Sequence, residues 1–116
     1  MQNTVSLTNN YEFRRLYAKG KSAVSPTVVV YMRRSKRPGN RLGFTVTAKL
    51  GKAVVRNRVR RRLREIYRLH EGELRQGLDL VVVARGRSTA ASYAQLERDY
   101  LSCCQKLDLL RGEDAT

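Results

Sequence analysis

The sequence predicts one α+β domain in which a small sheet packs against helices as an α/β sandwich. Short runs of β-branched residues, such as TVVVYM and LDLVVVA, alternate with longer segments whose apolar residues recur at helical spacing. The predicted order is α, β, β, α, β, α, with a possible short extra strand near 21–24. A chain of 116 residues is long enough for one modest core. We expect 1–7 and 112–116 to be flexible ends.

The first helix is expected to begin after Asn9 and to end at Gly20. Asn9 followed by Glu12 is typical of a capped helix start, and apolar residues then recur at helical spacing. A Ser-Pro pair at 25–26 breaks the chain before the first strand.

A hairpin is expected to follow this break. The run 27–32 is β-branched and aromatic, which is typical of a strand, and 33–41 contains a Pro-Gly turn signal and five positive charges. The return strand is expected at 42–48, where apolar and polar or small residues alternate. This alternation assigns Leu42, Phe44, Val46 and Ala48 to the core and Gly43, Thr45, Thr47 and Lys49 to the opposite face.

The last third of the chain predicts a buried strand and a final helix. A polar connection at 70–77 leads to the strand 78–84, which is apolar along its whole length. A basic loop follows, and Ser92 with Gln95 is typical of a second capped helix start. One stripe of that helix carries Tyr93, Leu96, Tyr100, Cys103 and Leu107.

The charge of the chain predicts a polyanionic partner. The 24 Lys and Arg residues exceed the 10 Asp and Glu residues, which gives a net charge of +14. Arg outnumbers Lys 18 to 6, and the guanidinium fork suits phosphate oxygens and base edges. Nucleic acid is therefore the favoured partner. No apolar run could span a membrane and no signal sequence opens the chain, so the expected location is the cytoplasm.

Residues suited to catalysis or metal binding are sparse. Cys103 and Cys104 are adjacent, which is poor geometry for a disulfide, and we expect both to be reduced helix residues. His70 is the one histidine and has no partner at ligand spacing, so we expect a surface residue. No acidic pair lies within the basic segments, and no glycine-rich phosphate loop is present. We therefore predict no catalytic or metal site in this chain.

The arginine-rich segment after Gly51, with its arginines between Arg56 and Arg68, predicts a helix with two different faces. At 100 degrees per residue its apolar residues fall on one arc, while most of its seven arginines lie opposite. Arg62 is the exception, and its stem must run over the edge of the core. A solvated charged face is the alternative, but such faces normally mix signs, and here Glu65 is the one acid. The apolar arc holds Val55, Val59, Leu63, Ile66 and Leu69, and the opposite side holds Arg56, Arg58, Arg60, Arg61, Arg64 and Arg68.

The stretch LGKAVVRNRVRRRLREIYR (50–68) resembles the signature of the bacterial ribonuclease P protein subunit. The segments VVVY, LGFTVT and DLVVVAR also come in that family's order. The resemblance implies a partner of a catalytic RNA, with which the protein removes the 5′ leader from precursor tRNA. It implies Mg²⁺ held mainly by the RNA, a chain that is inactive alone, and a monomeric protein. It also implies a ribosomal protein S5 domain 2-like fold with a left-handed βαβ crossover, against the general right-handed rule.

The resemblance assigns roles to three groups of residues. A cleft between the sheet and the first helix is expected to bind the leader, since an aromatic and polar groove suits single-stranded RNA. Simple helix packing is the alternative for Phe13 and Tyr17, and capping or bracing the turn is the alternative for Asn57. Many relatives carry two lysines where Ala48 precedes Lys49 here, so one contact is absent or supplied by Lys52. The leader cleft is expected to contain Phe13, Tyr17, Tyr31, Thr45, Thr47 and Lys49, and the helix facing the catalytic RNA Arg56, Asn57, Arg58, Arg60, Arg61, Arg64 and Arg68, with further basic contacts from Arg14, Arg15, Lys52, Arg85 and Arg87.

Two other classes of protein share some of these features. A ribosomal or assembly-type RNA-binding protein would have the same charge and cleft without a processing role. A DNA-binding module could place the arginine-rich helix in a major groove, but a strand precedes this helix where a helix-turn-helix protein has a partner helix.

Overall fold

The computed structural model describes residues 4–111 as three α-helices, five strands and three short 3-10 turns. The predicted order α, β, β, α, β, α and the short extra strand near 21–24 are confirmed, whereas the strand Thr4–Ser6 was not predicted. The elements are β1 (Thr4–Ser6), α1 (Asn10–Lys19), β2 (Lys21–Val24), β3 (Val28–Arg34), β4 (Asn40–Thr45), η1 (Ala48–Leu50), α2 (Ala53–His70), η2 (Glu71–Glu73), β5 (Leu78–Ala84), η3 (Gly86–Thr89) and α3 (Tyr93–Lys106).

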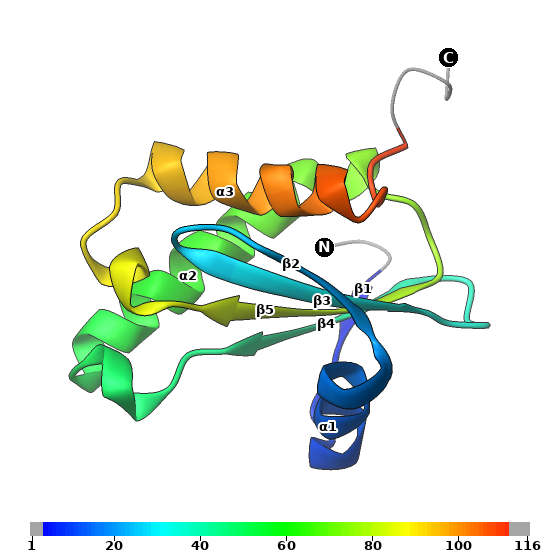
Figure 1. Cartoon of the computed structure of the whole chain (residues 1–116), viewed down its shortest axis with the longest axis horizontal. Coiled ribbons are helices and arrows are strands. Elements are labelled where there is room, and N and C mark those ends of the chain that lie inside the picture. Colours follow the sequence, from blue (N-terminus) through cyan, green and yellow to red (C-terminus); the bar gives the residue numbers. More distant parts are fainter. Residues whose placement is uncertain (1–3, 112–116) are drawn as a thin grey trace.

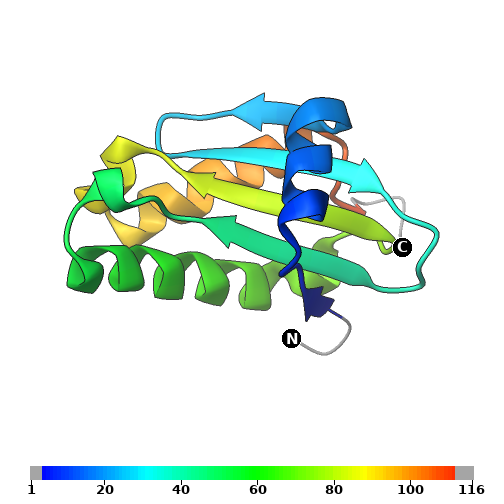
Figure 2. The same cartoon turned by 90° about the horizontal axis from the view of Figure 1, so that it is seen from below.

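All five strands form one mixed sheet in the order β1-β4-β5-β3-β2. β4 is parallel to both β1 and β5, whereas β3 is antiparallel to β5 and β2. The predicted hairpin is wrong, because β5 lies between β3 and β4 and pairs with both of them. Helices α2 and α3 cover one face of the sheet, and α1 lies across the strands on the other face (Figures 1 and 2). The predicted α+β class, with one sheet sandwiched by helices, is confirmed.

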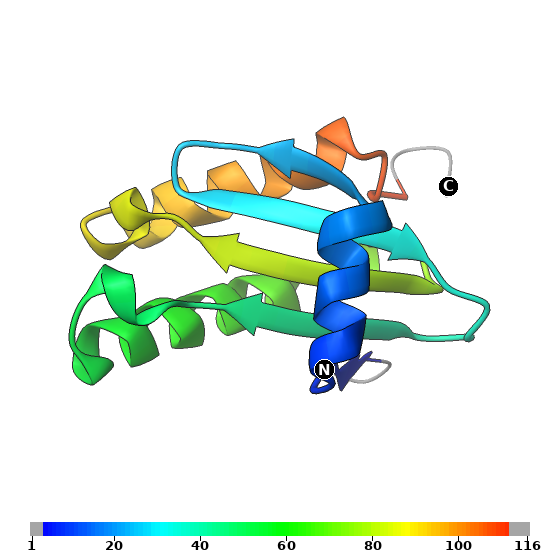
Figure 3. The same cartoon turned by 60° about the horizontal axis from the view of Figure 1, so that its bottom comes forward.

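The β4-α2-β5 crossover is left-handed. In Figure 3 the arrows of the parallel strands β4 and β5 point the same way, and α2 lies behind the sheet. When the view is turned so that both strands point upward, β5 lies to the right of β4, which is the left-handed arrangement. Most βαβ units have the opposite hand. This crossover brings the start of α2 to the end of the sheet where β4 stops (Figure 3).

Two apolar cores lie on the two faces of the sheet. The larger core fills the space between the sheet and α2 and α3, and the smaller one lies under α1. β5 serves both, because Leu80 and Val82 point into the larger core while Val81 points into the smaller one. A central strand covered on both faces is apolar at nearly every position.

Three further expectations, each about an individual segment, are wrong. Residues 4–7 are not flexible: Thr4–Ser6 pair with β4, Leu7 is buried, and the Leu7 amide donates to the Leu42 carbonyl at 2.8 Å. The remaining predicted flexible residues, 1–3 and 112–116, lie outside the described part of the chain. Ala48 is exposed, because the strand ends at Thr45 and the chain turns into η1.

The third correction concerns the apolar arc of α2. Val59, Leu63 and Ile66 are buried as predicted, but Leu69 is 52 % exposed. Tyr67 is fully buried near the end of the helix, and its hydroxyl lies 2.6 Å from Thr4 Oγ1. The hydroxyl thus has a partner inside the protein, which makes burial of the ring favourable.

Within residues 4–111 no helix is long and apolar enough to cross a membrane.

Candidate RNA interface

Helix α1 is fastened to the sheet by a charged network. Arg41 on β4 donates two hydrogen bonds to Asp79 on β5, from Nε at 2.8 Å and from Nη2 at 2.7 Å, and it also pairs with Glu12 on α1. Glu12 therefore does not act as the predicted capping partner, while Asn9 does cap the helix through the Tyr11 amide at 2.8 Å. The hydrogen bonds to Asp79 raise the pKa of Arg41 above its ordinary value, so the guanidinium stays charged.

The inner face of α1 presents aromatic rings to the sheet. The Tyr17 ring meets the edge of Tyr31 at a centroid distance of 4.9 Å, and Phe13 lies 6.5 Å from Tyr17. The Tyr17 hydroxyl lies 2.5 Å from Thr45 Oγ1 on β4. Phe13 approaches the backbone of Gly43 so closely that a Cβ there would collide with its ring. The inner face of α1 is thus held in register with β4.

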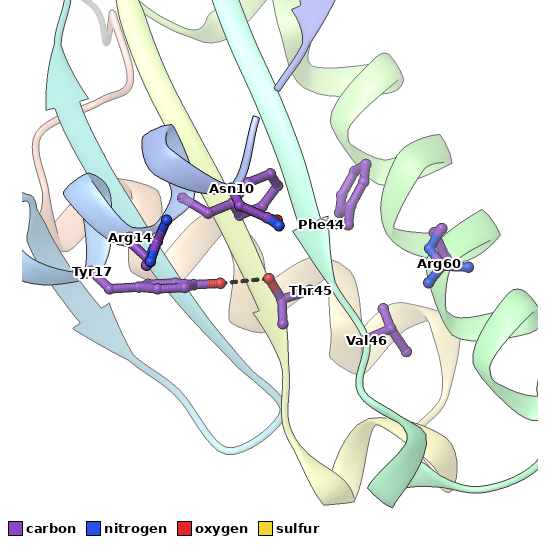
Figure 4. A pocket seen from close by; sticks show the side chains of 8 residues that line it. Asn10, Arg14, Tyr17, Phe44, Thr45, Val46 and Arg60 are labelled. Atoms are coloured by element: carbon purple, nitrogen blue, oxygen red, sulfur yellow. Dashed lines mark hydrogen bonds between the residues drawn. The ribbon is translucent and has the colours of Figure 1, made fainter. Parts of the chain in front are cut away.

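A groove of about 590 Å³ opens between α1, the end of β4 and α2 (Figure 4). The short strand β1 pairs with β4 only at Asn40–Leu42, so the rest of that edge carries no further strand. Figure 4 shows the Tyr17 hydroxyl directed at Thr45, with Arg60 of α2 on the far side of β4. The groove is lined by Asn10, Phe13, Arg14, Tyr17, Phe44, Thr45, Val46 and Arg60.

The groove contains half of the residues predicted for a leader cleft. Phe13, Tyr17 and Thr45 line it, and Tyr31 contacts Tyr17 from the side of the sheet. Phe13 also packs against the smaller core, so helix packing and groove lining are both roles of this ring. Thr47 and Lys49 do not line the groove, because they follow the end of β4 and are exposed there.

Five groove residues lie outside the predicted cleft, and one of them, Arg14, was predicted as a further basic contact. Phe44 and Val46 were assigned to the core by alternation, and both do pack against it, yet their edges also reach the open side of β4. Asn10 carried no signal beyond its place in the first turn of α1. Arg60 was expected on the surface that faces the catalytic RNA, and the structure places it in the groove as well.

The arginines of α2 differ in how far they are engaged within the protein. Arg61 and Arg64 are exposed and form no hydrogen bond or ion pair within residues 4–111. In contrast, Arg58 donates to the Thr89 carbonyl at 3.1 Å, and Arg62 donates to the Ala91 carbonyl at 3.3 Å. Arg62 thus runs along the edge of the core as predicted, and the loop before α3 receives both contacts.

Of three other residues of the predicted surface, two have side-chain contacts within the protein and the third has a buried nitrogen without a partner. Arg68 pairs with Glu65 through two hydrogen bonds, which lower the pKa of the Glu65 carboxyl. Asn57 accepts from Arg60 at 3.2 Å rather than capping the helix, because Lys52 occupies the cap position. The Nε atom of Arg56 is buried and has no hydrogen-bond partner among the described residues.

The further basic residues predicted to contact RNA lie at several places. Arg14 lines the groove, and Arg15 lies near the charged network under α1. Lys52 is exposed at the N-cap position of α2, and Arg87 is exposed within η3. Arg85 donates to the Ser25 carbonyl at 2.7 Å, so this side chain also braces the turn before β3.

His70 differs from the prediction, because it has two acidic partners. Its Nδ1 lies 2.5 Å from Glu73 and its Nε2 lies 2.8 Å from Glu97. Partial burial opposes protonation, but the hydrogen bonds to Glu97 and Glu73 outweigh it and raise the pKa of His70. The described residues contain no cluster of three potential His, Cys, Asp or Glu metal ligands.

Both cysteines are free and buried, as predicted for reduced helix residues. Burial raises the pKa of the Cys104 thiol to about 12, so this group stays protonated at neutral pH.

The sequence model of a family described as Ribonuclease P matches residues 1–108. The ribonuclease P protein component of Natranaerobius thermophilus is 38 % identical over 111 residues, which cover 96 % of each chain. The solved Staphylococcus aureus RNase P protein superposes with a TM-score of 0.84 and 29 % identity, covering 91 % of this chain and 97 % of that one. A mutant of the S. aureus protein, described as having defective mRNA degradation activity, gives a TM-score of 0.83 at 29 % identity and covers 90 % and 89 %.

Proposed function

Because this chain belongs to the ribonuclease P protein family, whose role is tied to maturation of the tRNA 5′ end, we propose that it binds two RNA molecules at once. The groove between α1, β4 and α2 takes the 5′ leader of precursor tRNA. The outer arginines of α2 take the catalytic RNA. We also propose that the protein acts in the cytoplasm, the location expected from its sequence.

The composition of the groove is the observation that carries this proposal. It brings the Tyr17 and Phe13 rings, the Thr45 hydroxyl and the Arg60 guanidinium to one surface. Aromatic faces stack on unpaired bases of any identity, and guanidinium groups bind phosphates. A leader varies in sequence from one tRNA to another, so a binding site that tolerates every base is what this substrate requires.

We propose that the RNA partner, and not this protein, cleaves the substrate. Among residues 4–111, no acidic side chain or histidine lines the groove, and both nitrogens of His70 are already engaged with Glu73 and Glu97. Magnesium prefers clustered oxygen ligands. The described residues do not offer such a cluster, so we assign the ion to RNA oxygens and route no step through this protein. The chain alone is accordingly proposed to be inactive.

The test compares two ligands and two substitutions of one residue. Tyr17→Leu removes a ring that can stack, whereas Tyr17→Phe keeps the ring and removes the hydroxyl that meets Thr45. In the assembled holoenzyme, Tyr17→Leu should weaken binding of precursor tRNA by about 1 to 3 kcal/mol for one lost stacking contact. Binding of mature tRNA should be unchanged, since it has no leader. Tyr93→Leu, on a helix at the other face of the sheet, is the matched control.

Two results would contradict the proposal. An equal loss for precursor and mature tRNA would assign Tyr17 to assembly with the catalytic RNA. Cleavage of precursor tRNA or of mRNA by rigorously RNA-free protein would place the chemistry in the chain itself. The RNA that co-purifies with the chain separates this role from that of a ribosomal assembly protein, because the latter would retain ribosomal RNA.

A further inference from the structure

The outer face of α1 carries a second hollow that the groove does not include. This hollow has a volume of about 450 Å³ and is built from one helix alone. Tyr11 forms one end of it and is 61 % exposed, although large aromatic side chains are usually more buried. Ala18 lies two turns further along, and its small side chain leaves the space open. Arg14, Arg15 and Lys19 complete the lining.

The charge of this hollow has no counterpart within the protein. Arg14, Arg15 and Lys19 form no ion pair or hydrogen bond with any residue of the range 4–111. The one acid of α1, Glu12, is turned toward the sheet and pairs with Arg41. Three uncompensated cations around an exposed aromatic ring attract an anion that also has a flat apolar face. A nucleotide of single-stranded RNA has both properties.

Arg14 links the outer hollow to the groove. It lines both cavities, and Figure 4 shows it on α1 beside Tyr17, at the rim of the groove. The basic surface therefore continues around α1 without an acidic residue between the two sites. A strand that leaves the groove past Arg14 meets Tyr11 after crossing the helix, whose diameter with side chains is about 10 to 12 Å.

We infer that the outer face of α1 is a second binding site for the leader, in which Tyr11 stacks on a base that lies beyond the groove. This inference rests on the proposed function, because it extends the path of the same RNA strand. Arg15 and Lys19 bind the phosphates on either side of that base. The continuity through Arg14 favours the leader as the occupant over an unpaired segment of the catalytic RNA.

The experiment varies leader length in the assembled holoenzyme. Precursor tRNAs are prepared with a short leader that ends inside the groove and with a long leader that extends past it. Tyr11→Leu should bind the long-leader substrate about 5- to 10-fold more weakly, the lower part of the range for one stacked base. It should bind the short-leader substrate and mature tRNA as the unchanged protein does. Tyr11→Phe keeps the ring and should behave like the unchanged protein with all three ligands.

The charged residues give an independent measurement. Arg15→Gln combined with Lys19→Gln should flatten the log-log salt dependence of long-leader binding by roughly 0.7 per lost phosphate contact. The slope for the short leader should not change. These side chains are exposed, so the variants should unfold at the same temperature as the unchanged protein, which a thermal melt checks.

Two results would overturn the inference. A Tyr11→Leu loss that is equal for long leader, short leader and mature tRNA would assign the face to the catalytic RNA. An unchanged affinity for every ligand would show that no RNA contacts Tyr11. Both results leave the groove proposal standing if Tyr17→Leu still separates precursor from mature tRNA, so failure of the two ideas can be told apart.

Discussion

Replacing Arg41 by Met tests the charged network that fixes α1 over the sheet. Methionine keeps much of the apolar stem but removes the guanidinium from Asp79 and Glu12. The side chain of Asp79 is only 12 % exposed, so its carboxylate would remain in a poorly solvated place without its two hydrogen bonds. Breaking a buried ion pair costs about 3 to 5 kcal/mol, and the residual exposure here lowers our expectation to about 2 to 4 kcal/mol.

Urea unfolding of five proteins measures this cost: the unchanged protein, Arg41→Met, Glu12→Gln, Asp79→Asn and the double variant Arg41→Met with Asp79→Asn. Arg41→Met should be the least stable, since it leaves a carboxylate uncompensated. Glu12→Gln should cost about 1 kcal/mol or less, because its side chain is 28 % exposed and Arg41 keeps Asp79. The double variant Arg41→Met with Asp79→Asn should regain much of the loss, because no charge is then left without a partner.

The reasoning is refuted if Arg41→Met unfolds at the same urea concentration as Glu12→Gln. It is equally refuted if the double variant is as unstable as the sum of its two single changes, since the coupling between the two groups would then be zero. A total stability of about 5 to 15 kcal/mol makes an effect of the expected size easy to resolve.

Three further predictions concern other parts of the molecule. Gly43→Ala should destabilise the protein by about 1 to 3 kcal/mol in a urea titration and weaken leader binding, because the new methyl group collides with the Phe13 ring. Unchanged stability would show that Phe13 does not lie against Gly43. His70→Gln should lower the free energy of unfolding by its full amount below about pH 6.5, the ordinary pKa of histidine, and this loss should disappear as the pH rises through the raised pKa of the folded state. Denaturation at several pH values measures it, and a loss of stability that grows with pH would contradict the prediction. Arg61→Gln with Arg64→Gln should flatten the log-log salt dependence of catalytic RNA binding by roughly 0.7 to 0.9 per contact, without a change in melting temperature. Arg58→Gln should also lower the stability, because it loses the hydrogen bond to the Thr89 carbonyl, and equal stability of the two variants would contradict this difference.

Local patterns were sufficient for most of the fold. The strand at 78–84 and the buried residues Val59, Leu63 and Ile66 follow from apolar runs and helical spacing, which depend on a few neighbouring residues. Capping residues located the starts of α1 and α3 for the same reason. Patterns of this kind fail at the ends of elements. The register of β4 was continued by alternation to Ala48, although the strand ends at Thr45.

Features that depend on residues distant in the sequence were missed. Strand β1 has three residues and forms only because β4 offers a parallel partner nearly forty positions later. Tyr67 replaces Leu69 in the core because its hydroxyl finds Thr4, which no helical periodicity could indicate. Glu97, one of the two acids beside His70, comes from α3, so its approach depends on how the helices pack.

The groove itself shows why a site can be only half predicted. Phe13 and Tyr17 were assigned to it by family resemblance, whereas Arg60 enters it because of the unusual crossover. The left-handed path from β4 carries α2 back along the edge that β1 leaves open, and one arginine of α2 then faces the rings of α1 across that edge. Arg61 is the next residue, but on a helix it points about 100 degrees away, toward solvent. This arrangement supports the proposal that the arginine-rich segment contacts two RNA strands, because successive positions on one helix face different directions.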